Sequence, residues 1–116
     1  MAAIIDGRKT ALTGLREIYE HAAEPLPQAG QRYRVLDSRG RSATVIELTE
    51  VRGVPLREID DEFARSEGRG YAGVAEWRAA HEELFQSDQM SRFLGYTPVV
   101  DGDTIVVAER FRVVPE

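Results

Sequence analysis

Apolar and polar residues along the chain predict a β-hairpin near its middle. The segments 32–37 and 42–51 flank Asp37-Ser38-Arg39-Gly40, a turn sequence whose glycine can take a positive φ. The second arm is β-branched and apolar on both faces between Ala43 and Thr49. Because such a strand lies deep in a sheet or barrel rather than at a solvated edge, we expect this arm to be buried.

Helical spacing follows this hairpin and predicts two helices. The first begins at Pro55, which suits a first helical turn, and ends at Gly68 and Gly70. Its apolar positions recur at helical intervals, at Leu56, Ile59 and Phe63. The second helix is expected from Val74 to Gln89, with an apolar face made by Val74, Trp77, His81, Leu84 and Phe85.

The N-terminal part predicts shorter elements. A short helix over residues 2–6 is closed by Gly7, and a strand begins near Thr10. Residues 16–23 suit either a short helix or a continued strand. Residues 24–30 contain two prolines, which fix φ and remove amide donors, so they suit a loop.

The C-terminal part predicts a second hairpin. Residues 98–100 and 104–114 flank the turn sequence Asp101-Gly102-Asp103. Helices placed between β-segments favour an α+β fold on a mostly antiparallel sheet, closed as a small barrel with two main helices inserted between its strands. At 116 residues and 42% apolar content, we expect a single domain over residues 1–116.

Composition excludes several classes of site and of protein. The absence of cysteine excludes a disulfide framework, a thiolate zinc site and a cysteine nucleophile. No apolar run approaches the ~20 residues of a membrane span, and no charged segment followed by an apolar one opens the chain. We therefore expect a soluble, cytoplasmic protein.

The net charge of −5 is unevenly distributed. Residues 1–42 carry seven basic and five acidic side chains, whereas 43–116 carry eight basic and fifteen acidic ones. The chain lacks the broad basic face of a protein that coats a long duplex. The basic residues of the first part suit a short anionic or nucleoside-like ligand, or simply a solvated mixed-charge surface. They are Arg8, Lys9, Arg16, Arg32, Arg34, Arg39 and Arg41.

The first candidate site is Gly7-Arg8-Lys9-Thr10, where a helix end gives way to a strand. Lys9 is the only lysine among fifteen basic residues. A lysine, unlike an arginine, can lose its proton when desolvated and act as a base. The alternative is a helix-ending glycine followed by an exposed basic pair.

Glu67 is the second candidate. It lies in the last turn of the first predicted helix, where the helix dipole disfavours a carboxylate by roughly 0.3–1 kcal/mol. A residue that breaks a local rule is sometimes placed by function. The alternative is a carboxylate that faces solvent or pairs with Arg65 or Arg69.

Three aromatic residues form a third candidate group. Trp77 and His81 are one helical turn apart, and together with Tyr71 they would stack on and hydrogen-bond a planar base. The alternative, which we favour for Trp77 and His81, is packing in the core.

Other kinds of site find no support in the sequence. His21 and His81 lie in different predicted elements, and no clustered carboxylates accompany them, so we expect no metal. There is no Gly-x-Ser-x-Gly nucleophile elbow and no phosphate-binding glycine motif, so we expect no cofactor.

A series of short motifs nevertheless runs through nearly the whole chain in a fixed order. They are Gly7-Arg8-Lys9-Thr10-Ala11, Tyr19-Glu20, Glu24-Pro25-Leu26-Pro27 before Gly30, Val35-Leu36-Asp37 with Gly40, Ile46-Glu47-Leu48-Thr49-Glu50-Val51, Glu62-Phe63-Ala64 with Glu67-Gly68, Trp77-Arg78 with His81, and Val107-Ala108-Glu109-Arg110-Phe111. Taken together, these motifs resemble the ASCH (activating signal cointegrator homology) domain family, especially its stand-alone bacterial branch.

The resemblance implies a fold and a set of functions. It implies a PUA-like barrel that associates with RNA through a cleft lined by the Gly-x-Lys motif. Some relatives hydrolyse the acetyl group of N4-acetylcytidine with a lysine, a threonine and a glutamate, and ribonuclease activity has been ascribed to others. By this resemblance the lysine corresponds to Lys9 and the glutamate to Glu67.

The threonine of the hydrolases has no direct counterpart. In those relatives it follows the lysine by three positions, and Leu12 stands there, between Thr10 and Thr13. Since neighbouring residues of a strand face opposite ways, we expect Thr13 to need a bulge to replace it, whereas Thr10 shares the face of Leu12.

Two main hypotheses follow. The first is a module that binds single-stranded RNA or a small nucleoside or nucleotide, with ligand contacts from Arg8, Lys9, Thr10, Glu67, Tyr71, Trp77 and His81. The second is an amidohydrolase of acylated nucleosides, with Lys9 as base, Glu67 as acid or base, and Thr10 or Thr13 as the hydroxyl group. A protein-interaction domain that has lost the pocket is a third reading, since fold does not determine function.

Overall fold

The computed structural model describes residues 2–5 and 7–114. Within them the chain forms helices and strands in the order α1 (Ala2–Ile5), β1 (Ala11–Leu15), α2 (Arg16–His21), β2 (Arg32–Leu36), β3 (Ser42–Pro55), the 3-10 turn η1 (Leu56–Glu58), α3 (Asp61–Ser66), α4 (Val74–Phe85), α5 (Asp88–Leu94) and β4 (Ile105–Val114). The short segment 16–23, for which helix and strand were both possible, is therefore helical over α2.

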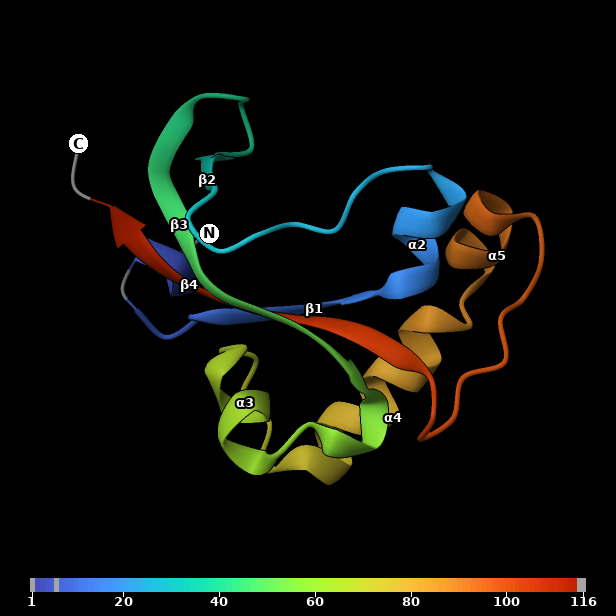
Figure 1. Cartoon of the computed structure of the whole chain (residues 1–116). Helices are drawn as coiled ribbons and strands as arrows, with labels where there is room; N and C mark the ends of the chain where they lie inside the picture. The colour runs from blue at the N-terminus through green and yellow to red at the C-terminus, as the bar shows by residue number, and fades with distance from the viewer. Residues whose placement is uncertain (1, 6, 115–116) are drawn as a thin grey trace.

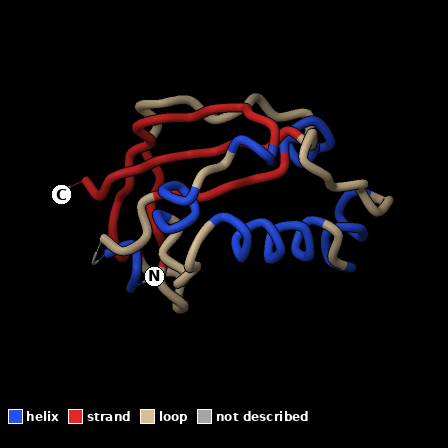
Figure 2. Tube along the Cα trace, turned by 90° about the horizontal axis from the view of Figure 1, so that it is seen from below, coloured by secondary structure: helices blue, strands red, loops and turns tan. Residues whose placement is uncertain are grey.

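The strands form one antiparallel sheet in the order β1-β4-β3-β2. Its register along β3 and β4 shifts between Leu48 and Glu50, where one extra residue bends the strand. The sheet is curled into a half-barrel, and α3 and α4 lie on one side of it while the loop after α2 crosses the other (Figure 1). Figure 2 shows α4 as a separate layer alongside the strands. The α+β class with a curled antiparallel sheet is thus confirmed.

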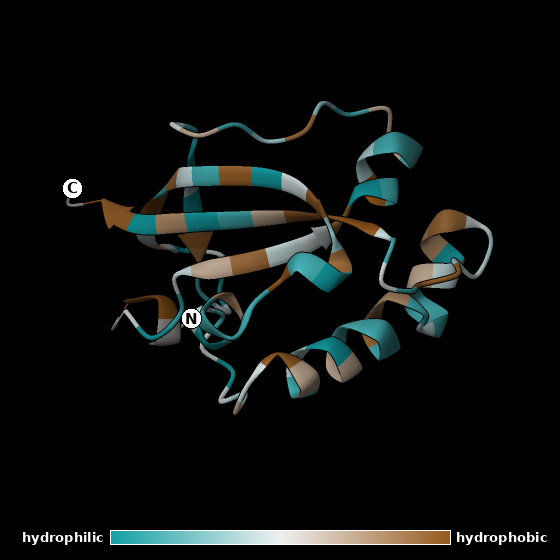
Figure 3. Cartoon of the chain, turned by 60° about the horizontal axis from the view of Figure 1, so that its bottom comes forward, coloured by the Kyte–Doolittle hydropathy of each residue, from teal (hydrophilic) through white to brown (hydrophobic). Residues whose placement is uncertain are grey.

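Each face of the sheet packs into its own apolar cluster, because successive residues of a strand point to opposite sides. On the helix side, Val106 and Ala108 of β4 join a core that contains Phe63 and Trp77. On the concave side, Phe111 packs with a smaller cluster that includes Ile46 and Leu48. Figure 3 shows the corresponding alternation of hydrophobic and hydrophilic residues along β3 and β4.

Both predicted helices are broken, and each break has a local cause. Pro55 ends β3, and the first helix divides into η1 and α3 because the Asp60 side chain accepts a hydrogen bond from the Phe63 amide (2.9 Å), which begins a new helix. The second ends at Phe85, not Gln89, since Ser87 caps α5 in the same way through the Met90 amide (3.3 Å).

The second predicted hairpin is wrong. Residues 98–100 form no strand, and β4 pairs with β1 on one side and β3 on the other. Because both hydrogen-bonding edges of β4 are occupied in this way, the residues before the turn have no edge to join.

A close backbone contact brings the start of β1 against the end of α3. Gly68 has a positive φ of 70°, and a Cβ atom there would lie 2.8 Å from the Arg8 carbonyl oxygen and 2.9 Å from the Lys9 Cα. The Thr10 amide donates to the Ser66 carbonyl at 2.7 Å beside this contact. Only glycine satisfies both the conformation and the space, and the contact places Lys9 next to Glu67.

Replacing Gly68 with alanine tests this contact against Gly70→Ala as a matched control. Gly70 also has a positive φ, of 79°, but nothing lies within 4 Å of a Cβ there. We expect Gly70→Ala to cost about 1–2 kcal/mol from the left-handed conformation alone, and Gly68→Ala to cost a further ~1–3 kcal/mol from overpacking. Urea unfolding measures both, and equal losses would contradict the close contact.

Candidate functional site

A pocket of about 410 Å³ lies beside the edge strand β1, at the ends of α3 and along α4. Its lining combines polar side chains with a few apolar ones: Lys9, Leu12, Thr13, Glu67, Arg69, Tyr71, Ala80, His81 and Leu84. The structure thus brings Lys9, Thr13, Glu67, Tyr71 and His81, all candidates from the sequence, to one place.

Glu67 is the polar centre of this pocket. It follows the last residue of α3, and only 3% of its surface is exposed. One carboxylate oxygen, Oε2, accepts hydrogen bonds from the Thr13 hydroxyl at 2.8 Å and from the Trp77 indole N–H. The other, Oε1, lies 3.5 Å from Nε2 of His81. The alternative of a solvent-facing Glu67 is therefore wrong.

These contacts determine the charge state of Glu67. Burial by itself raises the pKa of the carboxyl, but the hydrogen bonds from His81, Trp77 and Thr13 and the charge of His81 act in the opposite direction. The net pKa of Glu67 lies below its ordinary value, so the carboxylate is ionised at neutral pH.

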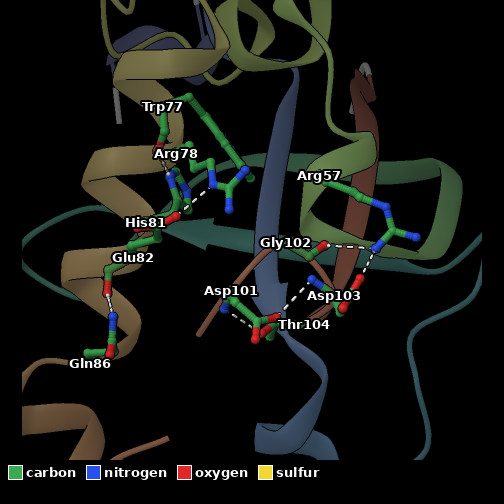
Figure 4. A network of polar contacts seen from close by, with 10 residues as sticks. All are labelled: Arg57, Trp77, Arg78, His81, Glu82, Gln86, Asp101, Gly102, Asp103 and Thr104. Carbon is green, nitrogen blue, oxygen red and sulfur yellow. Dashed lines mark hydrogen bonds and ion pairs between the residues drawn. The ribbon is translucent and has the colours of Figure 1, made fainter. Parts of the chain in front are cut away.

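Trp77 and His81 hold Glu67 from the core side. Trp77 is fully buried, so its ring offers no stacking surface to a ligand, and packing in the core is confirmed for it. The His81 ring stacks on it with centroids 4.3 Å apart, and its Nδ1 donates to the Trp77 carbonyl at 2.8 Å (Figure 4). Trp77 therefore contributes to the pocket through its hydrogen bond to Glu67 and not through an exposed ring.

Lys9 lies beside Glu67, and within the described residues its side chain forms hydrogen bonds to backbone carbonyls. Its Nζ donates to the carbonyls of Ala11 at 3.0 Å and Glu67 at 3.2 Å. Burial lowers the pKa of Lys9. The charge of Glu67 raises this pKa and the charge of Arg69 lowers it, and the net shift is downward. Since an ammonium group has three N–H donors, these two bonds leave one donor for a ligand.

Thr13 reaches the site without a bulge, so the expectation that it would need one is wrong. β1 pairs with β4 in continuous register, and Thr13 points to the same face as Ala11 and Leu15, toward Glu67. Leu12 packs with the cluster on the concave side. The spacing from Lys9 gave the wrong expectation, because tertiary packing and not the position of Lys9 determines which face of β1 meets Glu67.

The other predicted residues lie apart from the pocket or at its rim. Neither Arg8 nor Thr10 is among the residues that line it, and Thr10 contributes backbone bonds to Ser66 and Phe111. Tyr71 is partly exposed at the rim, with its ring centroid 6.2 Å from that of His81. Burial, and then the charge of Glu67, raise the pKa of the Tyr71 hydroxyl.

Arg69 lines the pocket and was missed as a binding residue by the sequence reasoning, which considered it only as a partner for Glu67. The signal was present: Arg69 directly follows Glu67-Gly68, two residues that the resemblance had already singled out. Its exposed guanidinium adds a second positive charge to the pocket beside Lys9.

Fold and site together define an α+β domain of the PUA-like type, with a polar pocket beside an edge strand. The family model of the ASCH domain matches residues 1–115, and the chain belongs to this family, which is generally linked to RNA binding. The resemblance seen in the motifs is therefore confirmed.

Solved structures agree with this assignment. The chain is similar to the ASCH domain from Lactobacillus crispatus JV V101, with 30% identity and a TM-score of 0.82 over 97% of this chain and 68% of that one. It is also similar to protein EF3133 from Enterococcus faecalis V583, with 28% identity and a TM-score of 0.81 over 97% of this chain and 64% of that one. The chain thus spans less than two thirds of EF3133. A comparison with curated proteins gives no match.

The described part of the chain also bears on metal binding and on membrane insertion. Among residues 2–5 and 7–114, no group of three or more His, Cys, Asp or Glu side chains is placed to hold a metal ion. None of the helices in these residues is long and apolar enough to cross a membrane.

The lowered pKa of Glu67 predicts a pH-dependent contribution to stability. A carboxyl whose pKa is lower in the folded state stabilises the fold above its ordinary value of 4.5, and this contribution is lost as the pH falls below that value. Replacing Glu67 with glutamine removes it, so we expect the free energy of unfolding to fall less steeply between pH 5 and pH 3. At pH 7 we expect the variant to lose about 1–3 kcal/mol.

Denaturant unfolding at a series of pH values measures both effects. Glu83→Gln makes the same chemical change at an exposed position of α4 and serves as the control. If Glu67→Gln and Glu83→Gln gave parallel pH profiles, the ionised network around Glu67 would be refuted.

Proposed function

We propose that the protein binds single-stranded RNA or a nucleotide in the pocket around Lys9 and Glu67. The observation that carries this proposal is that the charged side chains of the pocket differ in their hydrogen-bond partners. The carboxylate of Glu67 is held by Thr13, Trp77 and His81, while Lys9 and Arg69 keep donors for an outside partner.

The two cations suit a phosphate group. Lys9 has one N–H donor beyond its two backbone bonds, and the Arg69 guanidinium is exposed. Charged donors of this type bind phosphate oxygens with short, strong hydrogen bonds. The pocket therefore offers a local positive site on a chain whose net charge is −5. A local site of this kind fits a short strand or a single nucleotide better than a long duplex.

Tyr71 supplies the surface for a base. Its ring lies at the rim of the pocket and is partly exposed, unlike the buried ring of Trp77. Proteins hold unpaired bases by stacking them on aromatic rings of this kind, at about 1–3 kcal/mol per base. A nucleotide with its phosphate on Lys9 and Arg69 and its base on Tyr71 would use all three residues.

Binding of a labelled single-stranded RNA of about eight nucleotides, followed by fluorescence anisotropy, tests this proposal. We expect Lys9→Ala and Arg69→Ala each to weaken binding about tenfold and to reduce the slope of log affinity against log salt by about one. Arg92→Ala removes an equal charge from the exposed end of α5. Because this charge lies outside the pocket, we expect its loss to change the affinity and the salt slope only through the net charge of the chain. Equal effects of all three variants would refute binding at this pocket.

A second candidate function is the hydrolysis of an acylated nucleoside, and it is favoured by the hydrogen bond from Thr13 to Glu67. In this reaction the Thr13 hydroxyl oxygen attacks the acetyl carbonyl carbon, and its proton passes to Glu67 or to neutral Lys9. The C–N bond breaks as the amine takes up a proton, and water then releases acetate from the threonine. The low pKa of Glu67 makes this carboxylate a weak base, which is why we prefer binding.

Hydrolysis of N4-acetylcytidine to cytidine tests the second candidate. We expect any turnover to be lost in Lys9→Ala, Glu67→Ala and Thr13→Val but retained in Thr13→Ser, which keeps the hydroxyl group. Turnover that survives in Thr13→Val would exclude the acyl-threonine route. Gel analysis of the RNA from the binding experiment reads out ribonuclease activity, the remaining alternative.

A further inference from the structure

A second pocket, of about 580 Å³, lies on the concave side of the sheet, away from α3 and α4. Its floor contains Leu12, Ile46, Leu48 and Glu109 from three strands, and the segment Glu24–Pro27 contributes to its other side. This segment belongs to the loop that crosses the sheet between α2 and β2 (Figure 1). Hydrogen bonds of 2.7 and 2.9 Å between this loop and the backbone of Leu48 hold it in place.

Glu109 stands out in this pocket because nothing in the described chain neutralises it. It lies on β4, between two other strands, and is only 5% exposed. No hydrogen bond or ion pair joins its carboxylate to any described residue, unlike that of Glu67. Burial raises the pKa of Glu109 above its ordinary value of 4.5. A buried carboxylate without a partner costs free energy, so its presence here requires a reason.

The carboxylate of Glu109 faces the pocket and not a sealed core. Among the described residues, no side-chain nitrogen or oxygen is both closed off from solvent and without a partner. The oxygens of Glu109 are therefore reachable, and the pocket that it lines gives the access. The two other charged residues of β4 lie on the opposite face, where Arg110 packs over Phe63 and Arg112 binds Glu47.

The remaining lining makes the pocket acidic and apolar. It contains Glu24 as well as Glu109, and none of its residues is basic. The Tyr33 hydroxyl is already bonded to Gln31 at 2.8 Å. The pKa of Tyr19 is raised by burial and then by the charge of Glu109, which indicates that this hydroxyl lies near the carboxylate. Such a lining repels phosphate and attracts a positive group on an apolar body.

We propose that this second pocket binds a small organic cation in which two neighbouring N–H donors sit on a flat apolar body, with the carboxylate of Glu109 as its counter-ion. An amidinium group matches the two oxygens of a carboxylate with two parallel hydrogen bonds. The apolar floor on the sheet and the prolines of the loop suit a flat ring between them, and Tyr19 and Tyr33 add aromatic surface beside the charge. The site is independent of the RNA or nucleotide site proposed above, since it shares only Leu12 with that pocket.

Three ligands with the same ring and different charges test the proposal: benzamidine, benzamide and benzoate. Titration of the full chain, followed by amide chemical shifts in NMR, gives both the affinity and the place of binding. We expect benzamidine to bind and to shift the amides of Leu12, Tyr19 and Glu109, benzamide to bind at least about tenfold more weakly, and benzoate not to bind. Benzamide or benzoate binding as tightly as benzamidine overturns the proposal, as does the absence of benzamidine binding at about 1 mM.

Glu109→Gln keeps the shape of the side chain and removes its charge. We expect it to weaken benzamidine binding at least about tenfold while raising the melting temperature of the ligand-free protein, because a buried, unpaired charge is removed. Glu83→Gln, an exposed change of the same kind, should alter neither. Lys9→Ala should leave benzamidine binding intact, which separates this site from the pocket around Glu67. Unchanged affinity in Glu109→Gln overturns the assignment.

A measurement on the unaltered chain gives an independent check. Protonation of Glu109 removes the counter-ion, so the affinity for benzamidine should fall as the pH is lowered through the raised pKa of this carboxyl. The other ionisable groups that face the pocket are Glu24, Tyr19 and Tyr33. The same titration of Glu24→Gln assigns the effect to one carboxyl: a pH dependence that disappears in Glu24→Gln would contradict the role of Glu109.

Cytidine and guanosine, which carry N–H donors without a charge, should bind no more tightly than benzamide, and tighter binding would overturn the need for a cation.

Discussion

The carboxylate of Glu67 connects the distant strand β1 to the two consecutive helices α3 and α4. Its oxygens accept hydrogen bonds from Thr13 on β1 and Trp77 on α4 and lie 3.5 Å from Nε2 of His81, while the residue itself directly follows α3. A buried charge is tolerated only when such partners replace the water it has lost. The same bonds that stabilise the carboxylate therefore fix the distance of the edge strand from both helices, and with it the width of the first pocket.

The alternation along β1 and β4 separates the two pockets. On one face of the sheet, Thr13 and Ala108 belong to the helix side, and on the other, Leu12 and Glu109 belong to the concave side. The two buried glutamates differ in the partners available to them: hydrogen bonds lower the pKa of Glu67, whereas burial alone raises that of Glu109. Among the described residues, one face thus carries a hydrogen-bonded carboxylate in a pocket with two cations, and the other carries a buried carboxylate in a pocket that no basic residue lines.

Local patterns could predict much of the fold but not the geometry of the site. The hairpin of β2 and β3 followed from β-branched residues around an Asp-Ser-Arg-Gly turn, and Trp77 in the core followed from helical spacing. The helix breaks had readable causes in Asp60 and Ser87, whose capping roles were overlooked. The bond from Thr13 to Glu67 spans 54 positions, so no periodicity of β1 alone could reveal which face meets α3. The pocket around Glu109 likewise depends on where a distant loop crosses the sheet, since that loop forms part of its lining.

The contact at Gly68 has a consequence for how this chain can vary. Its neighbours are the carbonyl of Arg8 and the Cα of Lys9, which are backbone atoms present whatever side chains stand at those positions. No substitution of Arg8 or Lys9 would therefore relieve the clash that a larger residue at position 68 makes with their backbone. Glu67 is different, because its partners are side chains that can be exchanged together with it. In a selection for folded variants, position 68 should remain glycine even in lineages in which the polar network beside it has been replaced.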